Sequence, residues 1–222
     1  MEQPKNNFKI VSDKKARMIL PNAITLIGVC IGLTSIKFAL DGKFALAIVG
    51  ILFAGLMDAL DGRIARLIKG TSKIGKELDS LGDVISFGVA PAFIMYFWNL
   101  QYLDKLGWFV CLMYVVCVAL RLARFNVNSE EEQSWKDNFF EGVPAPAGGI
   151  IVLMPLVLSF SGLGEIFFKI NYDLVVPIFF IIVSMLLIST IPTYSFKKIV
   201  IPRTMTKFLL FGIVLFFGAL LV

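Results

Sequence analysis

Long apolar stretches separated by short polar connections dominate the chain. We place seven of them at residues 19–40, 43–69, 73–99, 105–125, 143–161, 173–191 and 204–222. Each is long enough to cross a bilayer core as a helix, which takes about 20 apolar residues. Backbone polar groups in lipid must be satisfied within their own segment. The pattern therefore predicts an all-α, polytopic membrane bundle of about seven transmembrane helices, with a range of six to eight.

The overall composition and the distribution of charge support a membrane protein. The chain is 58% hydrophobic, which is too apolar for a water-soluble domain. If the N-terminus lies in the cytoplasm, 17 of the 21 Lys and Arg residues fall on the cytoplasmic side, as the positive-inside rule requires. We therefore expect a cytoplasmic N-terminal segment over residues 1–18 and a transmembrane domain over residues 19–222. The net charge of +5 then favours an anionic membrane surface, and nothing indicates a nucleic-acid partner.

The side chains available for catalysis are restricted. The chain has no histidine, so a general base or metal ligand must come from Asp, Glu, Lys, Tyr or Cys. Cys30, Cys111 and Cys117 all lie in apolar segments without metal-ligand spacing, which favours a packing role.

One densely charged stretch lies at the cytoplasmic ends of the second and third segments. Asp58 and Asp61 are three residues apart on one predicted helix, and Asp79 and Asp83 are four apart on the next. Both spacings place the pair on one helix face. Two adjacent antiparallel helices can therefore direct four carboxylates to one point.

Small and basic residues accompany the aspartates. Gly62, Ala65 and Gly75 leave room beside them, and Arg66 and Lys73 are placed to hold phosphate charge. Four ionised carboxylates repel one another and need cations, and an all-carboxylate set favours Mg²⁺ or Mn²⁺. Two such ions about 4 Å apart can stabilise both the attacking and the leaving oxygen in phosphoryl transfer.

Two other interpretations apply to intramembrane carboxylates. Charged runs at membrane edges are commonly solvated faces, and an intramembrane aspartate can serve as a proton relay in an ion-coupled transporter. Neither explains why small residues and an arginine share the inward face with all four aspartates.

Eight of these positions, in "DALDGRIAR" (58–66) and "GKELDSLGD" (75–83), match the signature of the CDP-alcohol phosphotransferases in residue type and spacing. The resemblance implies that an alcohol attacks the β-phosphorus of a CDP-linked substrate and that CMP leaves. It implies two divalent cations, Mg²⁺ or Mn²⁺, bound by the four aspartates, with Asp83 also taking the proton of the acceptor hydroxyl. It further implies that Gly62, Arg66 and Ser72 line the CDP site, and that the protein is a homodimer.

Two further stretches bear on the acceptor alcohol. "ALRLARFNV" (119–127) contains Arg121, Arg124 and Asn126, and "FFEGVPAPAGG" (139–149) opens the fifth segment with prolines and glycines. Positive-inside anchoring and close helix packing are alternative explanations for them. Together they resemble the pattern of bacterial-type membrane phosphatidylserine synthases within this family, over residues of about 20 to 160.

This second resemblance implies CDP-diacylglycerol as donor and L-serine as acceptor, at the cytoplasmic face of a bacterial-type inner membrane. Arg121 or Arg124 would then supply a cation for the serine carboxylate. Glycerol 3-phosphate and inositol phosphate remain alternative acceptors. In "PNAIT" (21–25), Asn22 and Thr25 are three apart at the same membrane face, where they either contact the donor or cap the helix.

Overall fold

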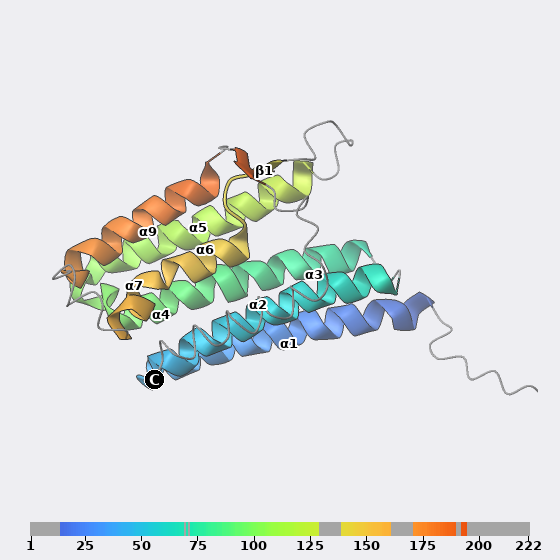
Figure 1. Ribbon diagram of the computed structural model, residues 1–222, viewed down its shortest axis with the longest axis horizontal. Coiled ribbons are helices and arrows are strands. Elements are labelled where there is room, and N and C mark those ends of the chain that lie inside the picture. Colours follow the sequence, from blue (N-terminus) through green and yellow to red (C-terminus); the bar gives the residue numbers. More distant parts are fainter. Residues whose placement is uncertain are drawn as a thin grey trace, which may run out of the picture.

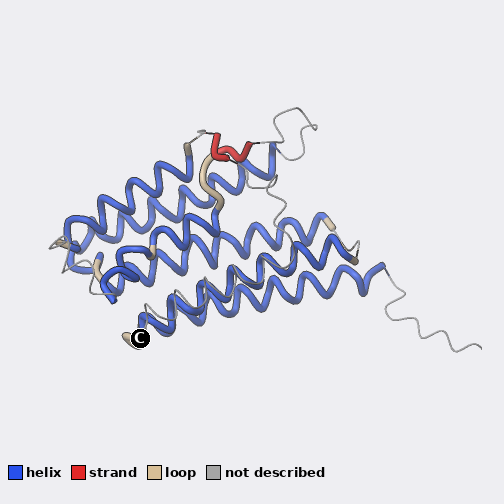
Figure 2. Tube along the Cα trace, viewed as in Figure 1, coloured by secondary structure: helices blue, strands red, loops and turns tan. Residues whose placement is uncertain are grey.

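The computed structural model describes residues 14–68, 70, 72–128, 139–160, 171–189 and 192–194. Figures 1 and 2 show helices packed side by side, with one short pair of strands. The helices are α1 (Lys14–Leu40), α2 (Phe44–Leu67), α3 (Lys73–Asp83), the π-helix η1 (Val84–Val89), α4 (Ala90–Trp98), the 3₁₀ helix η2 (Leu100–Leu103), α5 (Asp104–Asn128), α6 (Ala145–Val152), α7 (Met154–Phe160) and α9 (Tyr172–Ile188). The predicted all-α fold class is confirmed.

The strands β1 (Phe139–Glu141) and β2 (Pro192–Tyr194) were not predicted from the sequence. They pair antiparallel, with Phe139 opposite Tyr194. This pair joins the chain before α6 to the chain after α9.

Within the part of the chain that the structure describes, four helices are long and apolar enough to cross a membrane, at Ile19–Leu40, Phe44–Leu67, Lys73–Trp98 and Leu100–Val127. Ala145–Phe160 and Tyr172–Ile188 are shorter apolar helices. These ranges agree with the first six predicted segments to within a few residues at most ends. The chain is therefore an integral membrane protein. The seventh predicted segment, 204–222, lies outside the described residues.

Local capping explains two helix boundaries near the predicted ones. α1 ends in a turn with Gly42 at φ +72°, where the Lys43 N–H donates to the Phe38 carbonyl at 2.8 Å. This is the Schellman arrangement, in which glycine takes the left-handed position at low cost. α3 begins after Ser72, whose hydroxyl accepts from the Gly75 N–H at 3.0 Å.

Two spans that were predicted to be continuous are interrupted near a proline. The fifth divides at Leu153 into α6 and α7, because Pro155 has no N–H and its ring would clash with the carbonyl of Ile151. The third becomes a π-helix over Val84–Val89, just before Pro91.

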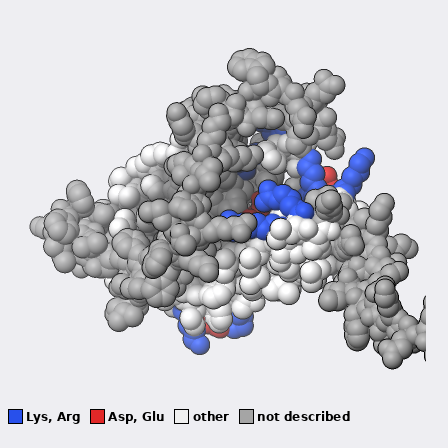
Figure 3. All heavy atoms as spheres, turned by 45° about the vertical axis from the view of Figure 1, so that its right-hand side comes forward, with Lys and Arg blue, Asp and Glu red and all other residues white. Residues whose placement is uncertain are grey.

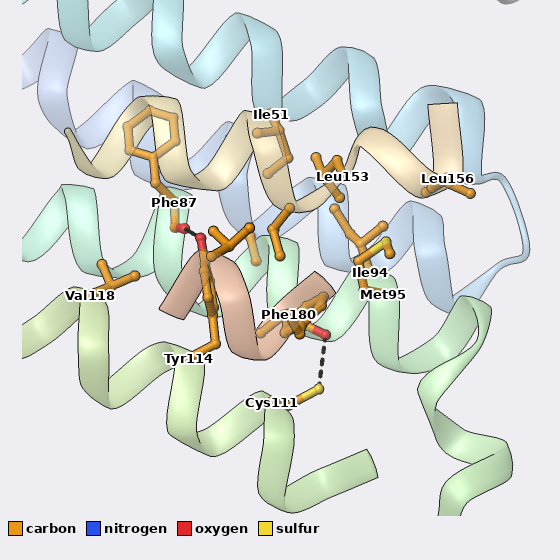
Figure 4. Close-up of a cluster of buried hydrophobic side chains, with 14 of the residues drawn as sticks. Ile51, Phe87, Ile94, Met95, Cys111, Tyr114, Val118, Leu153, Leu156 and Phe180 are labelled. Carbon is orange, nitrogen blue, oxygen red and sulfur yellow. Dashed lines mark hydrogen bonds between the residues drawn. The ribbon is translucent and has the colours of Figure 1, made fainter. Parts of the chain in front are cut away.

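The main hydrophobic core surrounds α4. α3 forms the other end of the same membrane span. α1 packs along α2 and also contacts α3 and α4, while α5 packs along α9. Figure 4 shows side chains from several helices meeting in this core, where the rings of Tyr114 and Phe180 stack edge-on at 5.3 Å. Cys111 and Cys117 are buried, as expected for packing residues, whereas Cys30 is exposed.

Candidate active site

The four predicted aspartates meet between α2 and α3. Carboxylate oxygens of Asp58, Asp61 and Asp79 lie within 4.8 Å of one another. The Asp58 carboxyl also contacts that of Asp83. The i, i+3 and i, i+4 spacings thus place the four side chains together, as the sequence suggested.

Asp61 is the most buried of these carboxylates, with 3% of its surface exposed. Its Oδ2 accepts from the Thr25 hydroxyl at 2.5 Å, so α1 contributes to the site. Its Oδ1 is buried and has no hydrogen-bond partner among the described residues. A buried, unpaired carboxylate oxygen is costly, more so beside other carboxylates.

These residues fit a divalent cation. The donors are all carboxylate oxygens, which Mg²⁺ and Mn²⁺ prefer, and one oxygen of Asp61 has no hydrogen-bond partner among the described residues. A small cavity of about 10 Å³ adjoins all four aspartates between α1, α2 and α3. Its size corresponds to about one water-sized sphere.

A larger cavity of about 330 Å³ lies beside this cluster. It is lined by Pro21, Asn22, Thr25, Asp61, Gly62, Ala65, Arg66, Gly70, Ser72, Gly75, Lys76 and Asp79. Asp61 and Asp79 border both cavities, so the larger one reaches the aspartate cluster.

The structure brings together seven of the eight residues proposed for donor binding. Lys73 is exposed and does not line the cavity. Lys76 lines it instead, and sequence reasoning missed it together with Pro21 and Gly70. The available signal was that Lys76 lies four residues after Ser72 and three before Asp79, hence on the same helix face.

Two glycines shape the larger cavity in different ways. A Cβ at Gly62 would have no atom within 4 Å, so this position faces open space. A Cβ at Gly75 would lie 3.0 Å from Asn22 Oδ1 and 3.1 Å from Ser72 Oγ, so the missing side chain lets α1 and α3 approach closely. Beside Gly62, Arg66 donates from Nε to the Gly62 carbonyl at 3.0 Å.

Basic side chains surround an acidic recess on the surface. Figure 3 shows one group of Lys and Arg atoms from the middle to the right of the visible face, with acidic atoms among them, and a second, smaller group at the lower edge. Arg66 is exposed at the cavity lining, and Lys76 is half-buried there. The cations lie where they can meet a polyanionic ligand that extends toward the aspartates.

The three candidates for acceptor binding lie at different places. Arg121 is half-buried and interacts electrostatically with Asp83, and its Nε has no hydrogen-bond partner among the described residues. Arg124 donates from Nη1 to the Ile188 carbonyl at 3.0 Å, at the C-terminal end of α9. Asn126 donates to the Ser80 hydroxyl at 3.0 Å. Of the three, Arg121 lies beside the aspartate cluster with an unpaired donor.

Comparison with known proteins identifies the family of the chain. The sequence profile of the CDP-alcohol phosphatidyltransferase family matches residues 18–217. The chain is 40% identical over 186 residues to the CDP-diacylglycerol–serine O-phosphatidyltransferase of Mycobacterium leprae, covering 83% of this chain and 61% of that protein. It is 34% identical over 181 residues to the protein of that name from Helicobacter pylori, covering 82% of this chain and 74% of the relative. For the Methanocaldococcus jannaschii protein of the same name, identity is 35% over 176 residues, covering 78% and 74%.

The matched length differs among these relatives. The alignment covers 61% of the Mycobacterium leprae protein, and 50% of the Mycobacterium tuberculosis protein of the same name, to which the chain is 43% identical over 145 residues. The chain thus spans about half to three-fifths of the length of these mycobacterial relatives.

Proposed function

Because the chain belongs to the CDP-alcohol phosphatidyltransferase family, we propose that it transfers the phosphatidyl group of CDP-diacylglycerol to the hydroxyl of L-serine and releases CMP. One observation carries this proposal: a cavity large enough for a nucleotide and lined by basic residues reaches a cluster of four carboxylates. The printed names of the relatives support serine as the acceptor.

The donor would lie with its CDP group in the larger cavity. Arg66 and Lys76 supply positive charge for the diphosphate, and the N-terminal end of α3, capped by Ser72, favours an anion through its free N–H groups. Gly62 leaves a surface without a side chain, against which a flat base or sugar can rest. Asn22 and Thr25 close the cavity from α1.

The transfer step needs a base for the serine hydroxyl, and we assign this role to Asp83. The serine oxygen bonds to the β-phosphorus, the bond from that phosphorus to the CMP oxygen breaks, and CMP leaves with the bonding electron pair. The hydroxyl proton passes to the Asp83 carboxylate. With no histidine in the chain, a carboxylate is the base nearest to this chemistry.

Asp58, Asp61, Asp79 and Asp83 would hold the divalent cations, Mg²⁺ or Mn²⁺, which when bound neutralise phosphate charge. The chain's own contribution is to hold these carboxylates close together despite their repulsion. Thr25 fixes one oxygen of Asp61, which leaves the other free for a ligand.

The serine zwitterion requires a cation for its carboxylate, and Arg121 is the better placed of the two candidate arginines. It lies beside Asp83 and has an unpaired N–H, whereas Arg124 already binds the end of α9. The positive-inside bias supports a site facing the cytoplasm. The family resemblance supports a homodimer, which cross-linking of the protein in native membranes would test.

The decisive experiment is CMP release by the purified protein from CDP-diacylglycerol, with Mg²⁺ or Mn²⁺ and a panel of alcohols. We expect release with L-serine and much less with glycerol 3-phosphate or inositol phosphate, whose phosphate groups need a more basic pocket. Release with glycerol 3-phosphate but not serine would overturn the serine assignment. Substrate flux into liposomes without any CMP release would indicate an ion-coupled transporter instead.

A further inference from the structure

The third span changes helix type directly after Asp83. Residues Val84–Val89 form a π-helix, in which the Ala90 N–H bonds to the Ile85 carbonyl five residues earlier. A π turn holds one residue more than an α turn, and such turns are uncommon and frequent at functional sites. This turn separates α3, which carries Asp79 and Asp83, from α4 in the core.

Pro91 explains why the α-helix is interrupted here. In an uninterrupted α-helix the Phe87 carbonyl would accept from the N–H of residue 91, which proline lacks, and the proline ring would press on the same carbonyl. The Phe87 carbonyl instead accepts from the Tyr114 hydroxyl of α5 at 2.8 Å, as Figure 4 shows. Because Tyr114 is fully buried, water cannot satisfy the Phe87 carbonyl here. The Tyr114 hydroxyl supplies the hydrogen bond that this carbonyl would otherwise lack.

Two glycines allow neighbouring helices to approach closely around the turn. A Cβ at Gly149 of α6 would lie 3.0 Å from the Phe87 backbone, and a Cβ at Gly32 of α1 would lie 2.8 Å from Ser86 Oγ. Gly149 belongs to the "GVPAPAGG" stretch, to which the proposed chemistry gives no role. The π turn is thus held from α1, α5 and α6 together.

We propose that this π turn, which we call the joint, sets the rotation of α3 about its axis and its position along that axis. Tyr114 is therefore a positioning residue for Asp79 and Asp83. The extra residue of the π turn rotates the part of the span before it relative to the part after it. Arg121 lies two helical turns beyond Tyr114 on α5, so the same helix that holds the joint also faces Asp83. The positioning role rests on the proposed function, in which Asp83 takes the proton of serine.

Two substitutions relax the joint with opposite effects on stability. Tyr114→Phe removes only the hydroxyl and leaves the Phe87 carbonyl unpaired, so the melting temperature should fall by about 4 °C. Pro91→Ala restores an N–H for the same carbonyl and favours a regular helix, so the melting temperature should stay or rise. Both variants should lower kcat about tenfold while the KM values for serine and CDP-diacylglycerol stay within about twofold.

The matched control is Tyr96→Phe. Tyr96 lies on α4, where its ring packs edge-on against Trp108 at 5.5 Å, away from the π turn. We expect wild-type kcat from this variant. A loss of kcat confined to Tyr114→Phe, with Pro91→Ala at the wild-type rate, would mean that Tyr114 does not act through the π turn and would overturn the proposal.

A cross-linking readout makes the test independent of the reaction. A Cβ at position 82 would lie 3.2 Å from Val29 Cγ2, so a Val29→Cys, Gly82→Cys pair suits a disulfide between α1 and α3. In a background with the three native cysteines changed to Ala, the disulfide should form several-fold more slowly when Tyr114→Phe or Pro91→Ala is added, and at the unchanged rate with Tyr96→Phe. Unchanged rates in all three would overturn the proposal. If the wild-type protein released no CMP, the proposed function would fail, and cross-linking alone would decide on the joint.

Discussion

The two halves of the third span have different tasks, although they form one membrane-crossing segment. In α3 one residue is fully buried, Gly82, and the helix presents Asp79 and Asp83 to the cavities. In α4 five of nine residues are buried, among them Ile94 and Met95. The first half holds carboxylates beside cavities, which destabilises the fold. The second half contributes buried apolar packing, which offsets this destabilisation. The π turn joins them, so changes in the two halves should affect different measurements.

The largest expected effect comes from Asp83→Asn in the first half. The variant loses the proposed base and one cation ligand, so CMP release should fall at least about 1,000-fold. Because one of four repelling carboxylates is removed, the melting temperature without added divalent cation should stay the same or rise. Enzyme kinetics and thermal unfolding measure the two effects.

The control for this variant is Glu77→Gln, which removes one carboxylate charge from an exposed position of the same helix. Its CMP release should remain near wild type. Substantial activity in Asp83→Asn would exclude Asp83 as the base.

In the second half, Ile94→Ala should act on stability alone. Ile94 is fully buried in α4, and deleting its side chain leaves a cavity that costs about 2 kcal/mol. Activity per folded molecule should be unchanged, because α4 lines neither cavity beside the aspartates. The measurement is unfolding in detergent or bilayer, with kcat taken on the folded fraction.

Ile178→Ala is the matched control, since Ile178 is 49% exposed on α9. Its loss should change stability little, because lipid is as apolar as the side chain it meets. A reduced kcat in folded Ile94→Ala would show that the two halves are not separable.

Arg66→Lys tests the donor cavity, with Arg63→Lys as control on the same helix. The guanidinium can bind a diphosphate through two parallel hydrogen bonds, and an ammonium cannot, so the KM for CDP-diacylglycerol should rise about tenfold. Arg63 is exposed and outside the cavity lining, so its variant should keep the wild-type KM. Equal KM values for the two variants would argue against a diphosphate at Arg66.

Periodicity and spacing were sufficient for most of the fold and for the aspartate cluster. Apolar length alone located the four helices that are long enough to cross a membrane and two shorter apolar helices, and helical spacing placed Asp58, Asp61, Asp79 and Asp83 on facing surfaces. These features depend on helix length and on the spacing of residues along one helix, and both can be read from the sequence.

The features that the sequence did not reveal depend on contacts between distant segments. The carbonyl of Phe87 accepts from the hydroxyl of Tyr114, 27 residues away, and no local sequence pattern predicts this hydrogen bond. Likewise, no local pattern in the sequence indicates that the Asn126 side chain bonds to Ser80, 46 residues away. The choice between Lys73 and Lys76 is made by the direction of α3, which places Lys76, and not Lys73, at the cavity.

The smallest expected effect comes from the contact between Ser80 and Asn126, which holds α3 to α5 within the functional half. Ser80 stands between Asp79 and Asp83, and it both donates to and accepts from the Asn126 amide, at 3.3 and 3.0 Å. Ser80→Ala removes this half-buried hydrogen bond, worth about 1 kcal/mol, so kcat should fall about threefold. Ser80→Thr keeps the hydroxyl and should recover most of the loss. If Asn126 contacted serine instead, Asn126→Ala would raise the KM for serine, whereas Ser80→Ala would leave it unchanged. Matching kcat losses in the two variants, with an unchanged KM, would establish that the pair positions α3.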